Sequence, residues 1–167
     1  MIEIEKKYLF DKIITNLQQK YLHIVYQWYT YSNNSKSVKE KCIFDLTRNK
    51  TIYVRVIKTK IKPGVSNKNI QHLECINANA LIGTKFVLKR RIITQNQIFI
   101  DQFIRSNGIC CQLMEYEGKD INNDILPCFS NIIDVTNNLA YYNENMCTEF
   151  TQQDFEHFIF LNHLLKR

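Results

Sequence analysis

The stretch IEIEKKYLF, residues 2–10, decides the fold, because charged and apolar side chains alternate along it. Glu3, Glu5 and Lys7 fall at every second position, and successive side chains of a β-strand point to opposite faces. The three charged groups therefore share one face of a strand, and Ile4 lies on the other. A solvated edge strand accounts for such a face, and so does a polar interior. Other strands must decide between the two.

Four further strand-like segments also place ionic residues on one face of a strand, and two of them carry like charges two residues apart. Like charges two residues apart repel, and a protein tolerates them chiefly where something bound supplies the opposite charge. A polyanion with a divalent metal meets both needs, because carboxylates bind Mg²⁺ or Mn²⁺ while Arg and Lys bind phosphate oxygens. The charged members are Arg55 in VRVIK, Lys89 and Arg91 in VLKRRI, Asp101 in IFIDQF, and Glu115 and Glu117 in LMEYEG.

Strand-like segments dominate the chain and indicate an α+β protein built mainly on an antiparallel closed β-barrel. About eight strands enclose an interior just wide enough for one small ligand, so the polar face of IEIEKK would look inward. Short helices are expected outside the barrel, one of them over residues 11–21. A C-terminal helix is predicted over residues 151–166, with Thr151 as its N-cap. No repeat or linker divides the chain, so we expect one domain over residues 1–167.

Composition narrows the class of protein. Of 167 residues, 45% are hydrophobic, which excludes a disordered chain, and no apolar run approaches the roughly 18 residues of a membrane span. The N-terminus lacks the apolar core of a secretory signal, and six cysteines without C-x-x-C spacing predict reduced thiols, so a cytoplasmic location is expected. A net charge of +6 implies an anionic partner: nucleic acid, a membrane surface or a phosphorylated small molecule.

These segments, in this order, resemble the CYTH domain, also called the triphosphate tunnel metalloenzyme family. IEIEKKYLF resembles its opening Glu-x-Glu-x-Lys strand, YVRVI the strand that usually carries two arginines, and FVLKRRI its Lys-x-Arg strand. IFIDQF is similar to its aspartate strand and LMEYE to its Glu-x-Glu strand. IIDVTNNLAYYN resembles the family's closing segment, with Val135, Thr136, Tyr141 and Asn143 in the motif positions. The matches span residues 2 to about 146.

The chain departs from the family pattern at several phosphate-binding positions. Ile57 stands where the second arginine of the Arg-x-Arg strand would be. Ile70 and His72 replace an arginine and a glutamate in the Arg-x-Glu-x-Glu strand, which keeps only Glu74. A separate phosphate-binding lysine has no clear counterpart; Lys58, Lys60 and Lys62 are candidates, with a solvated hairpin as the alternative. These losses predict reduced activity.

The resemblance implies a role for each charged position. Glu5, Lys7, Lys89 and Arg91 would be catalytic, and Lys7, Arg55, Lys89 and Arg91 would bind phosphate. Mg²⁺ or Mn²⁺ would be held by Glu3, Glu5, Asp101, Glu115 and Glu117. Weaker candidates are Glu74, His72 and Tyr141. For Arg55, Lys89 and Arg91, a solvated basic face is the alternative.

Three functions stay open at this point. The resemblance favours a divalent-metal-dependent hydrolase of linear triphosphates, acting on inorganic tripolyphosphate or a small organic triphosphate such as thiamine triphosphate. A class IV-type adenylyl cyclase is one alternative, and a catalytically weakened triphosphate- or nucleotide-binding protein is another. The expected partner is a triphosphate-containing small molecule, with nucleic acid only as an RNA 5′ end and no membrane. Either a monomer or a homodimer is expected.

Overall fold

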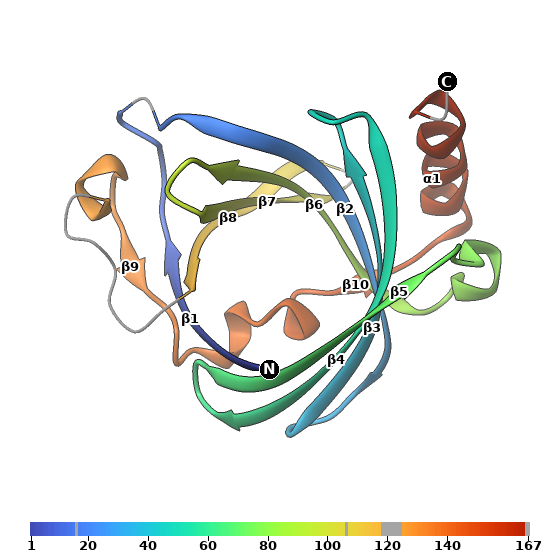
Figure 1. Cartoon of the computed structure of the whole chain (residues 1–167), viewed down its shortest axis with the longest axis horizontal. Helices are drawn as coiled ribbons and strands as arrows, with labels where there is room; N and C mark the ends of the chain where they lie inside the picture. The colour runs from blue at the N-terminus through green and yellow to red at the C-terminus, as the bar shows by residue number, and fades with distance from the viewer. Residues whose placement is uncertain (16, 106, 118–124, 166–167) are drawn as a thin grey trace.

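Alternating side chains build eight long strands that surround a common interior (Figure 1). The computed structural model of the chain describes residues 1–15, 17–105, 107–117 and 125–165. The strands are β1 (Ile2–Leu9), β2 (Gln19–Ser32), β3 (Lys36–Asp45), β4 (Lys50–Lys62), β5 (Val65–Leu73), β6 (Lys85–Thr94), β7 (Ile98–Arg105) and β8 (Gly108–Glu117).

The eight strands form a closed ring. Their order is β6-β2-β3-β4-β5-β1-β8-β7, and β7 returns to pair with β6. Every neighbouring pair is antiparallel, with Glu5 opposite Glu117 and Arg91 opposite Asp101. Two short strands are added: β9 (Ile133–Asp134) beside β1 and β10 (Thr148–Glu149) beside β6. The predicted closed antiparallel barrel of about eight strands is therefore confirmed.

The largest aromatic cluster lies on the outer face of the barrel wall, under helix α1 (Gln152–Leu165). Phe158 of this helix is 2% exposed and packs edge-on against Tyr26 and Trp28 of β2. Thr151 caps the helix, because its hydroxyl accepts a hydrogen bond from the Asp154 amide at 3.2 Å. The predicted C-terminal helix is confirmed, and it covers the wall from outside (Figure 1).

The helix predicted over residues 11–21 is wrong for the residues of that segment that the structure describes. Ile13 forms an isolated β-bridge with Phe129, and β2 already begins at Gln19. Leu17 packs against a second apolar cluster, which includes Tyr8 and Phe10 on the outer face of β1. Tertiary packing of the apolar side chains has overridden their helical spacing.

Short 3₁₀ turns complete the described chain: η1 (Ala78–Leu81), η2 (Leu126–Cys128), η3 (Leu139–Tyr141) and η4 (Asn143–Asn145). We call residues 135–147 the closing segment; it contains η3 and η4 and enters the ring of strands (Figure 1). Its side chains Tyr141 and Met146 pack with Phe103 and Leu113 from the barrel wall. The closing segment therefore fills one end of the barrel. No helix in the described ranges has the length and apolar character that a membrane crossing needs.

A tight turn fixes the β4–β5 hairpin against β1. Gly64 in this turn has a positive φ of 75°, which glycine adopts without the steric cost of a Cβ. Its carbonyl accepts a hydrogen bond from the Glu5 amide at 2.9 Å, and a Cβ added to Gly64 would meet the Glu5 carbonyl oxygen at 3.0 Å. The end of the hairpin is thus held beside the strand that opens the chain.

Candidate functional site

The strand register places the charged side chains of several strands on the inner face of the barrel. Residues directly opposite each other in a ladder share a face of the sheet, and Lys7 lies opposite Glu115 while Arg91 lies opposite Asp101. Among the residues predicted from the sequence, the register brings together Glu3, Glu5, Lys7, Lys89, Arg91, Asp101, Glu115 and Glu117.

An ion cluster surrounds Asp101 of β7, in which Asp101 and Lys89 are fully buried and the Arg91 side chain is 13% exposed. The Asp101 carboxylate accepts hydrogen bonds from Lys89 Nζ at 2.9 Å and from Arg91 Nε and Nη2 at 2.7 and 2.8 Å. Burial alone would raise the pKa of Asp101, but the charges of Arg91 and Lys89 lower it. The carboxylate is therefore ionised, and it holds the two cations of β6 in fixed positions.

Lys7 of β1 joins this cluster to the carboxylates beside it. Its Nζ lies 3.5 Å from Glu115 Oε1 and 3.6 Å from Glu5 Oε1, and it donates a hydrogen bond to the Tyr141 carbonyl at 3.4 Å. Glu115 Oε2 also lies 3.5 Å from Arg91 Nη2. Burial lowers the pKa of Lys7, yet Glu115 and Glu5 outweigh it, so the pKa is raised and the ammonium stays charged.

Glu3 at the opposite end of the charged row is held by two lysines. Lys58 was a sequence candidate for phosphate binding, with a solvated hairpin as the alternative, and Lys68 was not predicted. Lys58 Nζ of β4 lies 2.7 Å from Glu3 Oε1, and Lys68 Nζ of β5 donates to Glu3 Oε2 at 2.6 Å. Burial raises the pKa of Glu3, but these two lysines bring it down to about 2. Lys58 also lies 3.5 Å from Glu5 Oε2.

Lys39 and Lys41 of β3 are inner-face cations that sequence reasoning missed. They lie opposite Tyr29 and Gln27 of β2, and in the described part of the chain neither has a carboxylate within ion-pair distance. Burial lowers the pKa of Lys39 to about 7, with further lowering by nearby lysines such as Lys58 and Lys89. Burial and then Lys39 likewise depress the pKa of Lys41. Their spacing of two in VKEK is the same signal that marked the other strands.

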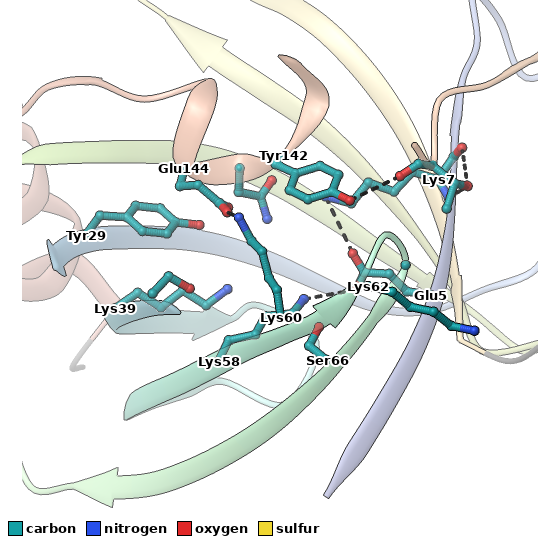
Figure 2. Close-up of a pocket in the computed structure, with 14 residues that line it drawn as sticks. Glu5, Lys7, Tyr29, Lys39, Lys58, Lys60, Lys62, Ser66, Tyr142 and Glu144 are labelled. Atoms are coloured by element: carbon teal, nitrogen blue, oxygen red, sulfur yellow. Dashed lines mark hydrogen bonds and ion pairs between the residues drawn. The ribbon is translucent and has the colours of Figure 1, made fainter. Parts of the chain in front are cut away.

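Lys39, Lys58 and Lys60 border a pocket between the barrel wall and the closing segment. Figure 2 shows Lys39 and Lys58 pointing into this space and Lys60 extending across it to Glu144. The Lys60 ammonium lies 2.5 Å from Glu144 Oε1 and 5.0 Å from the centre of the Tyr142 ring. The enclosed space is about 40 Å³, which holds only a few water molecules.

Arg55, predicted to bind phosphate inside the barrel, lies on the outer face. Its guanidinium donates to Glu40 of β3 at 2.9 Å, and its side chain is 41% exposed. Val54 and Val56 take the inner face of β4, where they lie opposite Lys41 and Lys39. The interior placement of Arg55 is therefore wrong: at this part of the wall the apolar residues, not the charged one, point inward.

The departures from the family pattern have different positions in the barrel. Ile57 shares the outer face with Arg55, so its replacement of an arginine does not alter the interior. His72 and Ile70 lie opposite Val54 and Val56, on the inward-facing register, but both are exposed, at the part of β5 beyond its pairing with β1. Neither residue lines the pocket with Lys39.

The other two weaker candidates, Glu74 and Tyr141, lie in different parts of the fold. Glu74 is exposed beyond the end of β5 and lies in a surface depression with Tyr53 and Leu165, away from Lys39 and Lys58. Tyr141 contributes its carbonyl to Lys7, whereas its ring packs with the apolar cluster at the closed end.

The carboxylates of Glu3, Glu5 and Glu117 have the chemistry that a hard divalent cation needs. Burial and the negative charges of Glu3 and Glu5 raise the pKa of Glu117, and a bound cation would relieve this repulsion. Over the ranges that the structure describes, no three Asp, Glu, His or Cys side chains converge into a formed metal site. The oxygens of Asp101 and Glu115 face Lys and Arg partners instead, so their role as metal ligands stays a prediction.

Comparison with known proteins finds similar folds at low sequence identity. No family profile and no curated protein matches the chain. The inorganic triphosphatase NE1496 matches 89% of this chain and 96% of its own length, with 15% identity and a TM-score of 0.45. HpAC1 from Hippeastrum, described with a dominant triphosphatase activity, matches 71% of this chain and 80% of its own, with 10% identity and a TM-score of 0.44. Likenesses at this level do not establish a shared activity.

Proposed function

We propose that the barrel binds a linear triphosphate and hydrolyses it with the help of Mg²⁺ or Mn²⁺. One observation supports this most strongly: Lys39 and Lys41 lie on the inner face without a carboxylate partner among the described residues. Burial without a counter-charge depresses the pKa of both lysines, and an anion that enters the barrel would favour their charged forms. The resemblance of the ordered motifs to the triphosphate tunnel family points to the same ligand.

The inner-face cations and carboxylates would divide the work of catalysis. Asp101 fixes Lys89 and Arg91, so the positions of these two cations are set before the ligand binds. They would then stabilise the negative charge that develops on the phosphate in the transition state without having to reorient. Lys39 and Lys41 would hold further phosphate oxygens. Glu3, Glu5 and Glu117 would hold the divalent cation, which neutralises phosphate charge and acidifies an attacking water when bound.

A binding protein without turnover is the second candidate, and one observation favours it. No formed three-donor metal site exists among the described residues. The ligand would then be held by the lysines and Arg91 alone. The cyclase alternative has no comparable support, because no observation of the described residues identifies an adenine pocket. We rank the hydrolase above the binding protein because the carboxylate oxygens of Glu3, Glu5 and Glu117 are suitable ligands for a divalent cation.

The proposal is tested by binding and turnover measured on the same variants. Purified protein is titrated with tripolyphosphate in a calorimeter, with and without Mg²⁺, and hydrolysis of tripolyphosphate, ATP and thiamine triphosphate is followed as phosphate, pyrophosphate and cyclic AMP. We expect Lys39→Met and Lys41→Met each to weaken binding about tenfold, since each removes one charge-assisted bond. Arg55→Met, on the outer face, is the matched control and should bind normally.

Glu5→Gln separates the two candidates. The hydrolase loses turnover on this change, whereas a binding protein has none to lose. No binding of any of the three triphosphates by the unmodified protein, with Mg²⁺ or Mn²⁺ present, would contradict both candidates.

A further inference from the structure

The closing segment is held over the pocket by two lysines that line it, Lys7 and Lys60. Lys7 donates to the Tyr141 carbonyl at 3.4 Å, and its ammonium lies 5.4 Å from the centre of the Tyr142 ring. Lys60 lies 5.0 Å from the same ring on its way to Glu144 (Figure 2). A ligand that draws on these lysines therefore competes with the contacts that keep the segment in place.

Glu144 is the carboxylate of this segment that reaches into the lysine-lined pocket. Its side chain is only 12% exposed, and Oε1 lies 2.5 Å from Lys60 Nζ. Burial raises the pKa of Glu144, but the hydrogen bond and charge of Lys60 bring it below the usual value, so Glu144 is ionised at neutral pH. Across the described ranges, Lys60 and Glu144 have no other partner at ion-pair distance.

The size of the pocket makes this contact an obstacle to a ligand. Lys39, Lys58, Lys60 and Glu144 all border a cavity of about 40 Å³, which has room for only a few water molecules. Lys60 crosses this space to Glu144, so a phosphate group that enters it meets the Lys60–Glu144 ion pair. The first phosphate that binds Lys60 must take the position of the Glu144 carboxylate.

We propose that Glu144 is an internal competitor of the phosphate ligand: it neutralises Lys60 and keeps the closing segment over the pocket until an anion displaces it. The inference rests on the proposed function, because it assigns the regulation of the same site. Displacement exchanges one charge-assisted bond of Lys60 for another, so Lys60 has an anionic partner whether or not the ligand is bound. Release of Glu144 and Tyr142 also loosens the segment.

The first experiment is a double-mutant cycle for tripolyphosphate binding, measured by calorimetry. Glu144→Gln keeps the size of the side chain and removes its charge, so we expect binding about tenfold tighter, equivalent to about 1.4 kcal/mol. Lys60→Met should weaken binding, and in its background Glu144→Gln should give no gain. Glu156→Gln, on the exposed side of α1, is the matched control and should not change the affinity.

The second experiment uses the unmodified protein, so it does not depend on whether a variant folds. Hydrogen exchange is followed at the amides of Asn145 and Met146, which bond to the Tyr142 and Asn143 carbonyls at 2.8 and 3.1 Å. Saturating tripolyphosphate should speed exchange at both, while amides of the β2–β6 ladder slow or stay unchanged.

The outcomes separate this inference from the proposed function. Binding to the unmodified protein without a gain in Glu144→Gln, or a gain that survives Lys60→Met, overturns the inference and leaves the function standing. Slower exchange at Asn145 and Met146 on binding also overturns it. Absence of binding in every variant overturns the proposed function itself.

Discussion

Replacement of Asp101 by asparagine tests whether the interior ion cluster holds the barrel together. The change keeps the shape of the side chain but removes the charge that accepts three hydrogen bonds from Lys89 and Arg91. Asp101 and Lys89 are both 0% exposed, so the cations would be left buried without their counter-charge. Breaking one partner of a buried ion pair costs about 3–5 kcal/mol. At about 2–4 °C per kcal/mol for a chain of this size, the melting temperature should fall by about 6–20 °C.

An ion pair on the outer face, with the same donor–acceptor distance as the Lys89–Asp101 bond, provides the control. Arg55 donates to Glu40 at 2.9 Å on the outer face, and such exposed pairs contribute about 1 kcal/mol or less. Both variants, Asp101→Asn and Glu40→Gln, are unfolded thermally and in urea at neutral pH. If Asp101→Asn loses no more stability than Glu40→Gln, the cluster is not a structural element and the reasoning from buried charge is refuted.

Three more predictions concern protons, metal and packing. Burial lowers the pKa of Lys39 to about 7, so its amine is largely neutral at about pH 8 in the unliganded protein. A bound phosphate favours the ammonium form, so the protein should take up a proton when tripolyphosphate binds. Calorimetry in two buffers of different ionisation enthalpy measures this uptake, which Lys39→Met should reduce. Mg²⁺ should raise the melting temperature by mass action, and a double change of Glu3 and Glu117 to Gln should abolish the gain; an unchanged response would place the ion elsewhere. Phe158→Ala should lower the free energy of unfolding in urea by about 3–5 kcal/mol. Phe160 of the same helix is 66% exposed, so Phe160→Ala should lower it by about 0.5 kcal/mol or less. Equal losses for the two variants would contradict the assigned packing.

Period-two charge patterns predicted much of the barrel interior. The rule worked for Glu3, Glu5 and Lys7, because Tyr8, on the opposite parity of the same strand, packs into an apolar cluster outside the wall. It failed for Arg55, because Val54 and Val56 also alternate with it and a strand read alone does not reveal which set faces inward. Only the register with β3 settles the choice, and that register depends on residues far away in the sequence.

Other features of the site were less accessible from the sequence. Lys39 and Lys41 show the same spacing of two in VKEK, which places both lysines on one face of a strand. Spacing alone does not distinguish an inner face from a solvated one, and the polar residues around these lysines suggest a solvated segment. Glu144 has no periodic signal at all, because it lies in an irregular turn that long-range packing brings to Lys60. Patterns within a strand predict its faces, whereas contacts between a turn and a distant strand depend on the assembled fold.

The pairing of β1 with β8 has a consequence for the order in which the chain folds. Glu5 meets Glu117 across this seam, whereas β2 and β3 meet their partners after a short turn. Bringing distant residues together costs more chain entropy than closing a hairpin, and non-local strand pairing is slow. The opening strand can therefore complete its pairing only once β8 is in place. Until the seam closes, Lys7 and Glu115 remain hydrated, so desolvation of the interior charges falls late in folding and adds to the final barrier.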